Sequence, residues 1–164
     1  MVVEMELLGV RLELPANAPV VLLREQEGDR RVLPIYIGPE EARAIALALE
    51  GVETPRPMTH DLMRDLLVAL DATVVGITVT ELRESTFYAE IEIQLGGRAV
   101  RVSSRPSDAV ALAVRVSAPI FASEDVLAEA AMPAAEEADE EEQEEIVDQF
   151  REFIDQVNPE DFAS

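Results

Sequence analysis

The 164-residue sequence contains no cysteine, no lysine, no tryptophan and a single histidine. Without cysteine there is no disulfide framework, zinc–thiolate site, iron–sulfur centre or thiol nucleophile. Without lysine there is no P-loop lysine, Schiff-base lysine or lysine general base. A single histidine excludes multi-histidine metal sites and leaves at most one imidazole for acid–base chemistry. These absences leave carboxylates, arginines, hydroxyls and His60 as the groups available for a functional site.

Long apolar segments and a basic N-terminus are also missing. No uninterrupted apolar run reaches the roughly 18 residues that a membrane span requires. The first residues, Met1 to Glu6, carry acids where a secretory signal peptide has its basic region. We therefore expect a cytoplasmic protein that does not associate with a membrane.

Positive charge is scarce. The 34 acidic residues outnumber 13 basic residues, all of them arginine, so the net charge is −21 and the sequence pI is about 4.2. The last 31 residues hold 13 acids and one base, whereas residues 1–133 hold 21 acids and 12 bases. Because cations that neutralise phosphates supply much of the affinity for nucleic acid, binding of DNA or RNA requires a local arginine cluster.

The apolar pattern predicts an α+β fold with a mixed, largely antiparallel sheet packed with about four helices, plus an acidic C-terminal helix. Strands are expected at residues 5–14, 19–24, 31–37, 73–83, 86–95 and 98–103. Helices are expected at 42–49 after the proline at 39, at 59–70 behind an N-cap at Thr59, from about 106, and from a cap at 123 to about 132. A change of parity across Leu8 and Gly9 predicts a β-bulge in the first strand.

The composition changes abruptly after Pro133, which divides the chain into an α+β domain (1–133) and an acidic tail (134–164). The tail is expected to begin as a solvated linker and to end in an amphipathic helix. The apolar stripe of that helix contains Ile146, Val147, Phe150, Phe153, Ile154 and Val157. Such a stripe predicts docking on the body of the chain, on a neighbouring subunit or on another protein; a helix that folds only weakly alone is the alternative.

His60 and Asp61 begin the second predicted helix, and two interpretations apply to them. In the first, Thr59 caps the helix, Asp61 interacts with the helix dipole, and His60 is a capping or surface group. In the second, Asp61 and Asp65, four residues apart on one helical face, bind a divalent cation such as Mg²⁺ or Mn²⁺.

A second polar helix start contains Arg105, Ser107 and Asp108. These residues are explained equally well by capping of the first turn combined with a buried ion pair between Arg105 and Asp61 or Glu41. The functional alternative uses the same helix N-terminus and the forked guanidinium of Arg105 to hold a phosphate group.

Five short segments, taken together, resemble the bifunctional nuclease family, also catalogued as domain of unknown function 151. They are Leu-Pro-Ile-Tyr-Ile-Gly (33–38), Glu-Ala (41–42), Arg-Pro-Met-Thr-His-Asp-Leu (56–62), Thr-Phe-Tyr-Ala (86–89) and Arg-Pro-Ser-Asp-Ala (105–109). The resemblance is collinear from about residue 3 to residue 131. It implies a compact α+β domain that forms homo-oligomers, with a dimer favoured, and an ability to degrade both DNA and RNA.

The resemblance also marks individual polar positions. They are Glu41, Arg56, His60, Asp61, Arg105, Ser107 and Asp108. One position departs from the family pattern, because this chain has Ser103 where many relatives have an acid. If that acid were a metal ligand or a base, activity here would be reduced or lost.

Two functions are therefore compared. In the first, a nuclease, a Mg²⁺ or Mn²⁺ ion activates water, arginines neutralise the phosphate and His60 protonates the leaving oxygen. The expected catalytic residues are His60, Asp61 and Asp108, the substrate-binding residues are Arg56, Arg105 and Ser107, and the metal ligands are Asp61, Asp108, Glu41 and Asp65. In the second, a non-catalytic oligomeric scaffold or regulator, these groups form a buried ion network in which Arg105 pairs with Asp61 or Asp108, and the acidic tail binds a protein partner.

The nuclease hypothesis has a geometric requirement. The two helix starts that follow the Arg-Pro pairs at 56–57 and 105–106 must face each other across a solvent-filled hollow of phosphate size. The tail carboxylates are further expected to act as a phosphate mimic that occupies such an arginine-lined groove.

Overall fold

The computed structural model describes residues 1–134 and confirms the predicted α+β fold. The strands are β1 (Val2–Glu13), β2 (Ala18–Glu25), β3 (Val32–Tyr36), β4 (Thr73–Arg83), β5 (Thr86–Leu95), β6 (Arg98–Ser104) and β7 (Ile120–Ser123). The helices are α1 (Pro39–Leu49), α2 (Thr59–Ala69), α3 (Pro106–Val116) and α4 (Glu124–Ala130). The predicted acidic C-terminal helix lies outside the described residues and stays a prediction.

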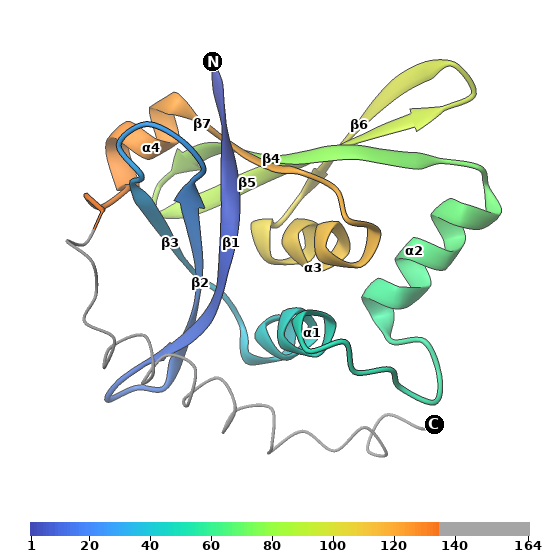
Figure 1. Ribbon diagram of the computed structural model, residues 1–164, viewed down its shortest axis with the longest axis horizontal. Coiled ribbons are helices and arrows are strands. Elements are labelled where there is room, and N and C mark those ends of the chain that lie inside the picture. The colour runs from blue at the N-terminus through green and yellow to red at the C-terminus, as the bar shows by residue number, and fades with distance from the viewer. Residues whose placement is uncertain (135–164) are drawn as a thin grey trace.

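The strands form one mixed sheet in the order β3-β2-β1-β7-β4-β5-β6 (Figure 1). Every neighbouring pair is antiparallel except β4 and β7. The register of β1 against β2 shifts between Leu7 and Gly9, which confirms the predicted bulge. The late strand β7 thus joins the hairpin formed by β1 and β2 to the meander formed by β4, β5 and β6.

Gly76 allows β4 and β7 to approach closely at this junction. A Cβ atom at position 76 would lie 3.0 Å from Cε2 of Phe121 and 3.3 Å from the carbonyl oxygen of Pro119. That carbonyl accepts a hydrogen bond from the backbone N–H of Ile77 at 3.0 Å. The absence of a side chain at Gly76 therefore permits the backbone contact that unites the two halves of the sheet.

The hydrophobic core lies between the sheet and helices α1, α2 and α3. Helix α3 packs against β4 and β5, and α1 and α2 pack on α3, as Figure 1 shows. The largest fully buried side chains include Leu23, Leu33, Ile45, Ile77 and Leu112, which come from both the sheet and the helices. Burial of this apolar surface fixes the positions of the helices and, with them, the positions of their N-termini. None of the helices in residues 1–134 is long and apolar enough to span a bilayer.

Helix boundaries differ from the prediction by up to three residues, the largest difference being at the start of α1. The expected N-cap, Thr59, is instead the first residue of α2, and Met58 occupies the cap position. The backbone N–H of Met58 donates to Oδ2 of Asp61 at 3.0 Å, so the carboxylate in the first turn accepts from the N–H of the N-cap residue, as the acidic residue of a capping box does. The predicted cap of α4 is confirmed, since Oγ of Ser123 accepts from the N–H of Val126 at 3.3 Å.

Candidate functional site

The N-termini of α1, α2 and α3 meet at one pocket with a volume of about 240 Å³. Residues Glu40 and Glu41 contribute from α1, Thr59 and His60 from α2, and Arg105 and Asp108 from the start of α3. Each helix presents unpaired backbone N–H groups and the positive end of its dipole at this terminus. The two helix starts expected to share a hollow therefore do so, and α1 adds a third that the sequence prediction did not include.

A continuous chain of polar contacts crosses this pocket. Nε2 of His60 lies 2.9 Å from Oδ1 of Asp108, and Nε of Arg105 donates to Oδ2 of the same carboxylate at 2.8 Å. Arg105 reaches in the other direction to Oε1 of Glu41, 3.0 Å from its Nη1. Asp108 thus uses one oxygen to hold the imidazole and the other to hold the guanidinium.

Burial and hydrogen bonding set the charge states in this chain of contacts. Burial raises the pKa of Asp108, but hydrogen bonds from Arg105 and then His60 outweigh burial, so the pKa lies below its ordinary value. The carboxylate of Asp108 raises the pKa of Arg105 further above its already high ordinary value. At neutral pH, Asp108 is therefore ionised and Arg105 is charged. The Arg105 side chain is 64% exposed, which leaves donors of its guanidinium directed to solvent.

Gly38 explains how Glu41 is positioned at the start of α1. A Cβ atom at position 38 would lie 2.2 Å from Oε2 of Glu41, so the carboxylate occupies the space that any other residue at 38 would fill. Pro39 follows as the first helical residue, where its missing N–H is not needed. The Gly-Pro-Glu-Glu segment therefore starts the helix and also folds Glu41 back toward Arg105.

The charged lining of the pocket is balanced, with Glu40, Glu41 and Asp108 opposed by Arg43, Arg105 and Arg115. Arg43 donates from Nη1 to both carboxylate oxygens of Glu40 at 3.2 Å. Its Nε is buried and has no hydrogen-bond partner within residues 1–134. A buried donor of this kind is costly unless a ligand or water accepts from it.

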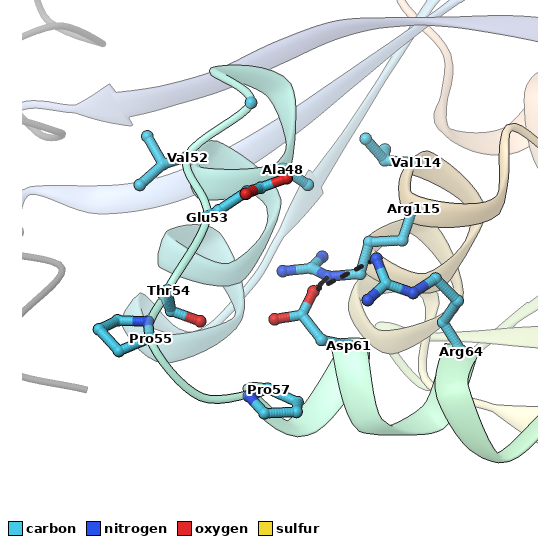
Figure 2. A pocket seen from close by; sticks show the side chains of 11 residues that line it. Ala48, Val52, Glu53, Thr54, Pro55, Pro57, Asp61, Arg64, Val114 and Arg115 are labelled. Atoms are coloured by element: carbon cyan, nitrogen blue, oxygen red, sulfur yellow. Dashed lines mark hydrogen bonds and ion pairs between the residues drawn. The ribbon is translucent and has the colours of Figure 1, made fainter. Parts of the chain in front are cut away.

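Asp61 lies in a second cluster, next to the first, and its partner is Arg115 near the end of α3. Nε of Arg115 donates to Oδ1 of Asp61 at 2.7 Å, and Arg64 approaches the same oxygen at 4.0 Å (Figure 2). Burial raises the pKa of Asp61, but hydrogen bonds from Arg115 and from the N–H of Met58 outweigh burial and lower it overall. Repulsion between Asp61 and Asp65 is thus compensated by arginines rather than by a cation.

Arg115 is the residue that sequence analysis missed. Its side chain is 5% exposed, and its other two nitrogens donate to the carbonyl oxygens of Ala111 at 2.8 Å and Ala44 at 2.9 Å. It therefore connects α1, α2 and α3 through one guanidinium, each of whose three nitrogens donates a hydrogen bond. A signal was present, because Arg115 is the only charged residue between positions 109 and 118.

The expected ion pairs are only partly present. Arg105 pairs with Glu41 and with Asp108, both of which were among its expected partners, and not with Asp61. Its side chain is exposed rather than buried as expected. Asp61 is taken instead by Arg115, which lies 54 residues further along the chain.

The four carboxylates expected to hold a metal do not converge. Asp61 is engaged by Arg115, Asp65 pairs with Arg64 at 3.1 Å, and Glu41 and Asp108 share Arg105. The part of the chain that the structure describes contains no group of three or more His, Asp or Glu side chains placed to hold a metal ion. These carboxylates therefore face arginines, and their arrangement does not fit a bound Mg²⁺ or Mn²⁺.

Two expected substrate-binding residues lie away from the pocket lining. Arg56 is exposed in the segment between α1 and α2, and Ser107 is buried in the first turn of α3. Ser103, at the position where many relatives have an acid, lies on β6 opposite Glu90 of β5 and is exposed. Of the residues marked by sequence, the structure gathers His60, Asp108, Arg105 and Glu41 at one pocket and places Asp61 beside it.

Comparison with known proteins gives a consistent result. The family model described as the bifunctional nuclease domain matches residues 21–135. An uncharacterized protein of Mycobacterium tuberculosis is 49% identical over 165 residues, which is 98% of this chain and 98% of that protein. Bifunctional nuclease 2 of Arabidopsis thaliana is 29% identical over 112 residues, covering 65% of this chain and 34% of the plant protein. Bifunctional nuclease 1 of Oryza sativa subsp. japonica is 24% identical over 114 residues, covering 66% and 34%.

Proposed function

Because the chain belongs to the bifunctional nuclease family, we propose that it hydrolyses phosphodiester bonds of DNA and RNA at the pocket between α1, α2 and α3. The observation that carries this proposal is the meeting of three helix N-termini at a pocket that contains the only histidine and an exposed arginine. All residues of that pocket fall within the family match, residues 21–135.

The phosphate is bound by groups that are already in place. Helix N-termini attract anions through their free N–H groups and the helix dipole, and residues from three helix starts line this pocket. The exposed guanidinium of Arg105 supplies a planar fork that matches two phosphate oxygens. This local arrangement supports phosphate binding despite the acidic character of the whole chain.

His60 acts as the general base and then as the general acid in the proposed reaction. The ionised carboxylate of Asp108 accepts from the ring Nε2–H, which fixes the tautomer and leaves Nδ1 with a free lone pair. Nδ1 takes a proton from the attacking water and returns it to the leaving oxygen, while Arg105 and the helix N-termini stabilise the charge that develops on the phosphoryl oxygens. Asp108 acts as the positioning residue for both His60 and Arg105.

The test is cleavage of single-stranded DNA and RNA oligonucleotides by the full chain and by two variants. His60→Gln and Arg105→Ala are each expected to reduce the cleavage rate at least about 100-fold while thermal melts stay cooperative. Arg83→Ala is the matched control, because it removes an arginine that pairs with a neighbouring acid, Glu81, at the β4–β5 turn. Cleavage at the wild-type rate by both variants would remove this site from the reaction.

A non-catalytic scaffold or regulator is the second candidate, and a specific observation favours it. The carboxylates of Glu41, Asp61 and Asp108 are each already paired with an arginine, as expected for a network that only holds helices together. In that case His60→Gln and Arg105→Ala lower the melting temperature together with any activity. Variants that stay folded and lose cleavage favour the nuclease, and variants that unfold favour the scaffold.

A further inference from the structure

A larger hollow, with a volume of about 410 Å³, adjoins the proposed active-site pocket (Figure 2). It is bounded by the segment Gly51–Pro57, by the first turns of α2 and by the end of α3. Arg115 lines both hollows, and the start of α2 separates them, with Met58, Thr59 and His60 on the side of the smaller pocket and Pro57 and Asp61 on the other side. The two hollows are therefore neighbours across one helix start.

The lining of the larger hollow combines an apolar wall with hydrogen-bonding groups. The apolar part consists of Ala48, Val52, Pro55, Pro57 and Val114. Asp61, Arg64 and Arg115 project into the space between this wall and the helices, as Figure 2 shows. The Arg64 side chain is 38% exposed, and its ion pairs are with Asp65 and Asp61 of its own helix. Its Nε and Nη2 contact Asp65, so the guanidinium offers a flat ligand its planar face and its remaining N–H groups.

The charge of the larger hollow favours a neutral ligand group. Its four charged residues are Glu53, Asp61, Arg64 and Arg115, so acids and arginines balance. Arg115 already has three hydrogen-bond acceptors, which reduces its capacity for an anion. A heteroaromatic base has an apolar face and a polar edge and carries no charge at neutral pH, and it therefore suits this lining better than a second phosphate does.

We propose that the larger hollow binds the nucleoside next to the phosphate held in the smaller pocket, so that the substrate is a single-stranded segment with one base turned out of the stack. This inference rests on the proposed function, because it requires the phosphate to occupy the smaller pocket. A base in a duplex does not reach a recessed hollow without unpairing, which gives single strands the advantage. Arg64 and the Val52 wall are then the groups that recognise the base.

Isothermal titration of the full chain tests this proposal with two probes, a dinucleoside monophosphate and the same compound lacking one base. The wild type is expected to bind the complete compound about tenfold more tightly than the abasic one, the scale of one base contact. Val52→Phe, which fills the hollow, and Arg64→Ala, which removes the guanidinium, are each expected to abolish that preference without weakening the abasic compound. Arg83→Ala, the matched arginine control, keeps it.

The outcomes separate the two proposals. If both variants keep the wild-type preference for the complete compound, the nucleoside site is wrong while the proposed function stands. If the wild type binds neither probe, or if Arg105→Ala binds both as the wild type does, the proposed function fails and the nucleoside site fails with it. Thermal melts accompany each titration, and Arg64→Ala decides alone if Val52→Phe does not fold, because Arg64 pairs only within its own helix.

Discussion

Arg115 shows at the scale of a residue how this site combines stability with chemistry. Its guanidinium is almost fully buried and bonds to groups on three helices, whereas the guanidinium of Arg105 at the other end of α3 is exposed and faces the pocket. A buried arginine whose three nitrogens each donate a hydrogen bond to a different helix holds its surroundings in place. An exposed arginine with donors to spare is free to bind a ligand.

Loss of the Arg115 guanidinium should destabilise the fold. Arg115→Met leaves the carboxylate of Asp61 in a half-buried position without its main partner, and the free energy of unfolding is expected to fall by about 3 kcal/mol. Arg83→Ala removes an exposed pair and is expected to change it by less than about 1 kcal/mol. Urea unfolding of both variants measures the difference, and equal effects would contradict the structural role of Arg115.

The lowered pKa values of Asp61 and Asp108 predict that the free energy of unfolding falls in acid. Since the pKa values of Asp61 and Asp108 are lower in the folded chain than in the unfolded chain, the unfolded chain binds more protons in acid. The stabilisation is fully present above the unfolded value of about 3.9 and is lost as the pH falls through the lower folded values. Urea unfolding at several pH values is expected to show this decline, with a smaller decline in Asp108→Asn. An equal decline in that variant would show that Asp108 does not contribute.

Glu41 competes with a phosphate for Arg105. Glu41→Gln removes the negative charge 3.0 Å from Nη1 of Arg105 and is expected to raise the affinity for inorganic phosphate a few-fold. Titration calorimetry measures this change, with Glu81→Gln, which affects the pair at Arg83, as the control. A lower affinity in Glu41→Gln than in the control would mean that Glu41 supports the bound anion rather than competing with it.

At the scale of elements, the contact between β4 and β7 joins the two halves of the sheet. Gly76→Ala places a methyl group 3.0 Å from the Phe121 ring and 3.3 Å from a backbone carbonyl, so one strand must shift. We expect the free energy of unfolding to fall by about 1–3 kcal/mol, the usual range for overpacking. Thr78→Ala, two residues along the same strand, is the control, and chemical denaturation is the measurement. A Gly76→Ala variant as stable as its control would contradict the close approach.

The helices and strands themselves were predictable because their signals are local. The Gly-Pro-Glu-Glu start of α1, the alternation in β5 and the bulge near Gly9 each act within a few residues. Boundaries moved where a side chain acts across a helical turn, as when Asp61 accepts from the N–H of Met58 and Met58 rather than Thr59 becomes the N-cap residue. Only the sheet order, in which β7 inserts between β1 and β4, needs contacts that no local pattern contains.

The candidate site was predictable only as a set of residues. Sequence patterns marked His60, Arg105 and Asp108, but the partner of each depends on how α2 and α3 pack, 48 residues apart in the case of His60 and Asp108. For the same reason the pattern suggested that Asp61 faces a cation, whereas packing gives it Arg115. Arg115 itself resembles an ordinary residue of a last helical turn, where a cation favours the helix dipole.

At the scale of the whole molecule, the net charge of −21 opposes binding of nucleic acid. The proposed site works against this field through helix N-termini and Arg105 within one pocket. Self-association, a cytoplasmic location and a protein partner for residues 134–164 stay predictions from the sequence and the family.

Deletion of residues 134–164 tests the effect of the acidic tail. The deletion removes 13 acids and one base, and the affinity for a single-stranded oligonucleotide is expected to rise because repulsion of the phosphates decreases. Fluorescence anisotropy at low and high salt measures it, and the gain should shrink as salt screens the charges. A gain that is independent of salt would instead indicate that the tail blocks the site by contact, and an unchanged affinity would exclude both effects.

The most direct test of the central claim is a titration of the ¹⁵N-labelled full chain with inorganic phosphate, followed by nuclear magnetic resonance. The account predicts that the largest shifts fall on the backbone amides at the starts of α1, α2 and α3, because residues of all three helix starts line the pocket proposed to bind phosphate. It also predicts that the same shifts disappear in Arg105→Ala. Shifts confined to other parts of the molecule, or no shifts at all, would contradict the claim that three helix starts form a phosphate site.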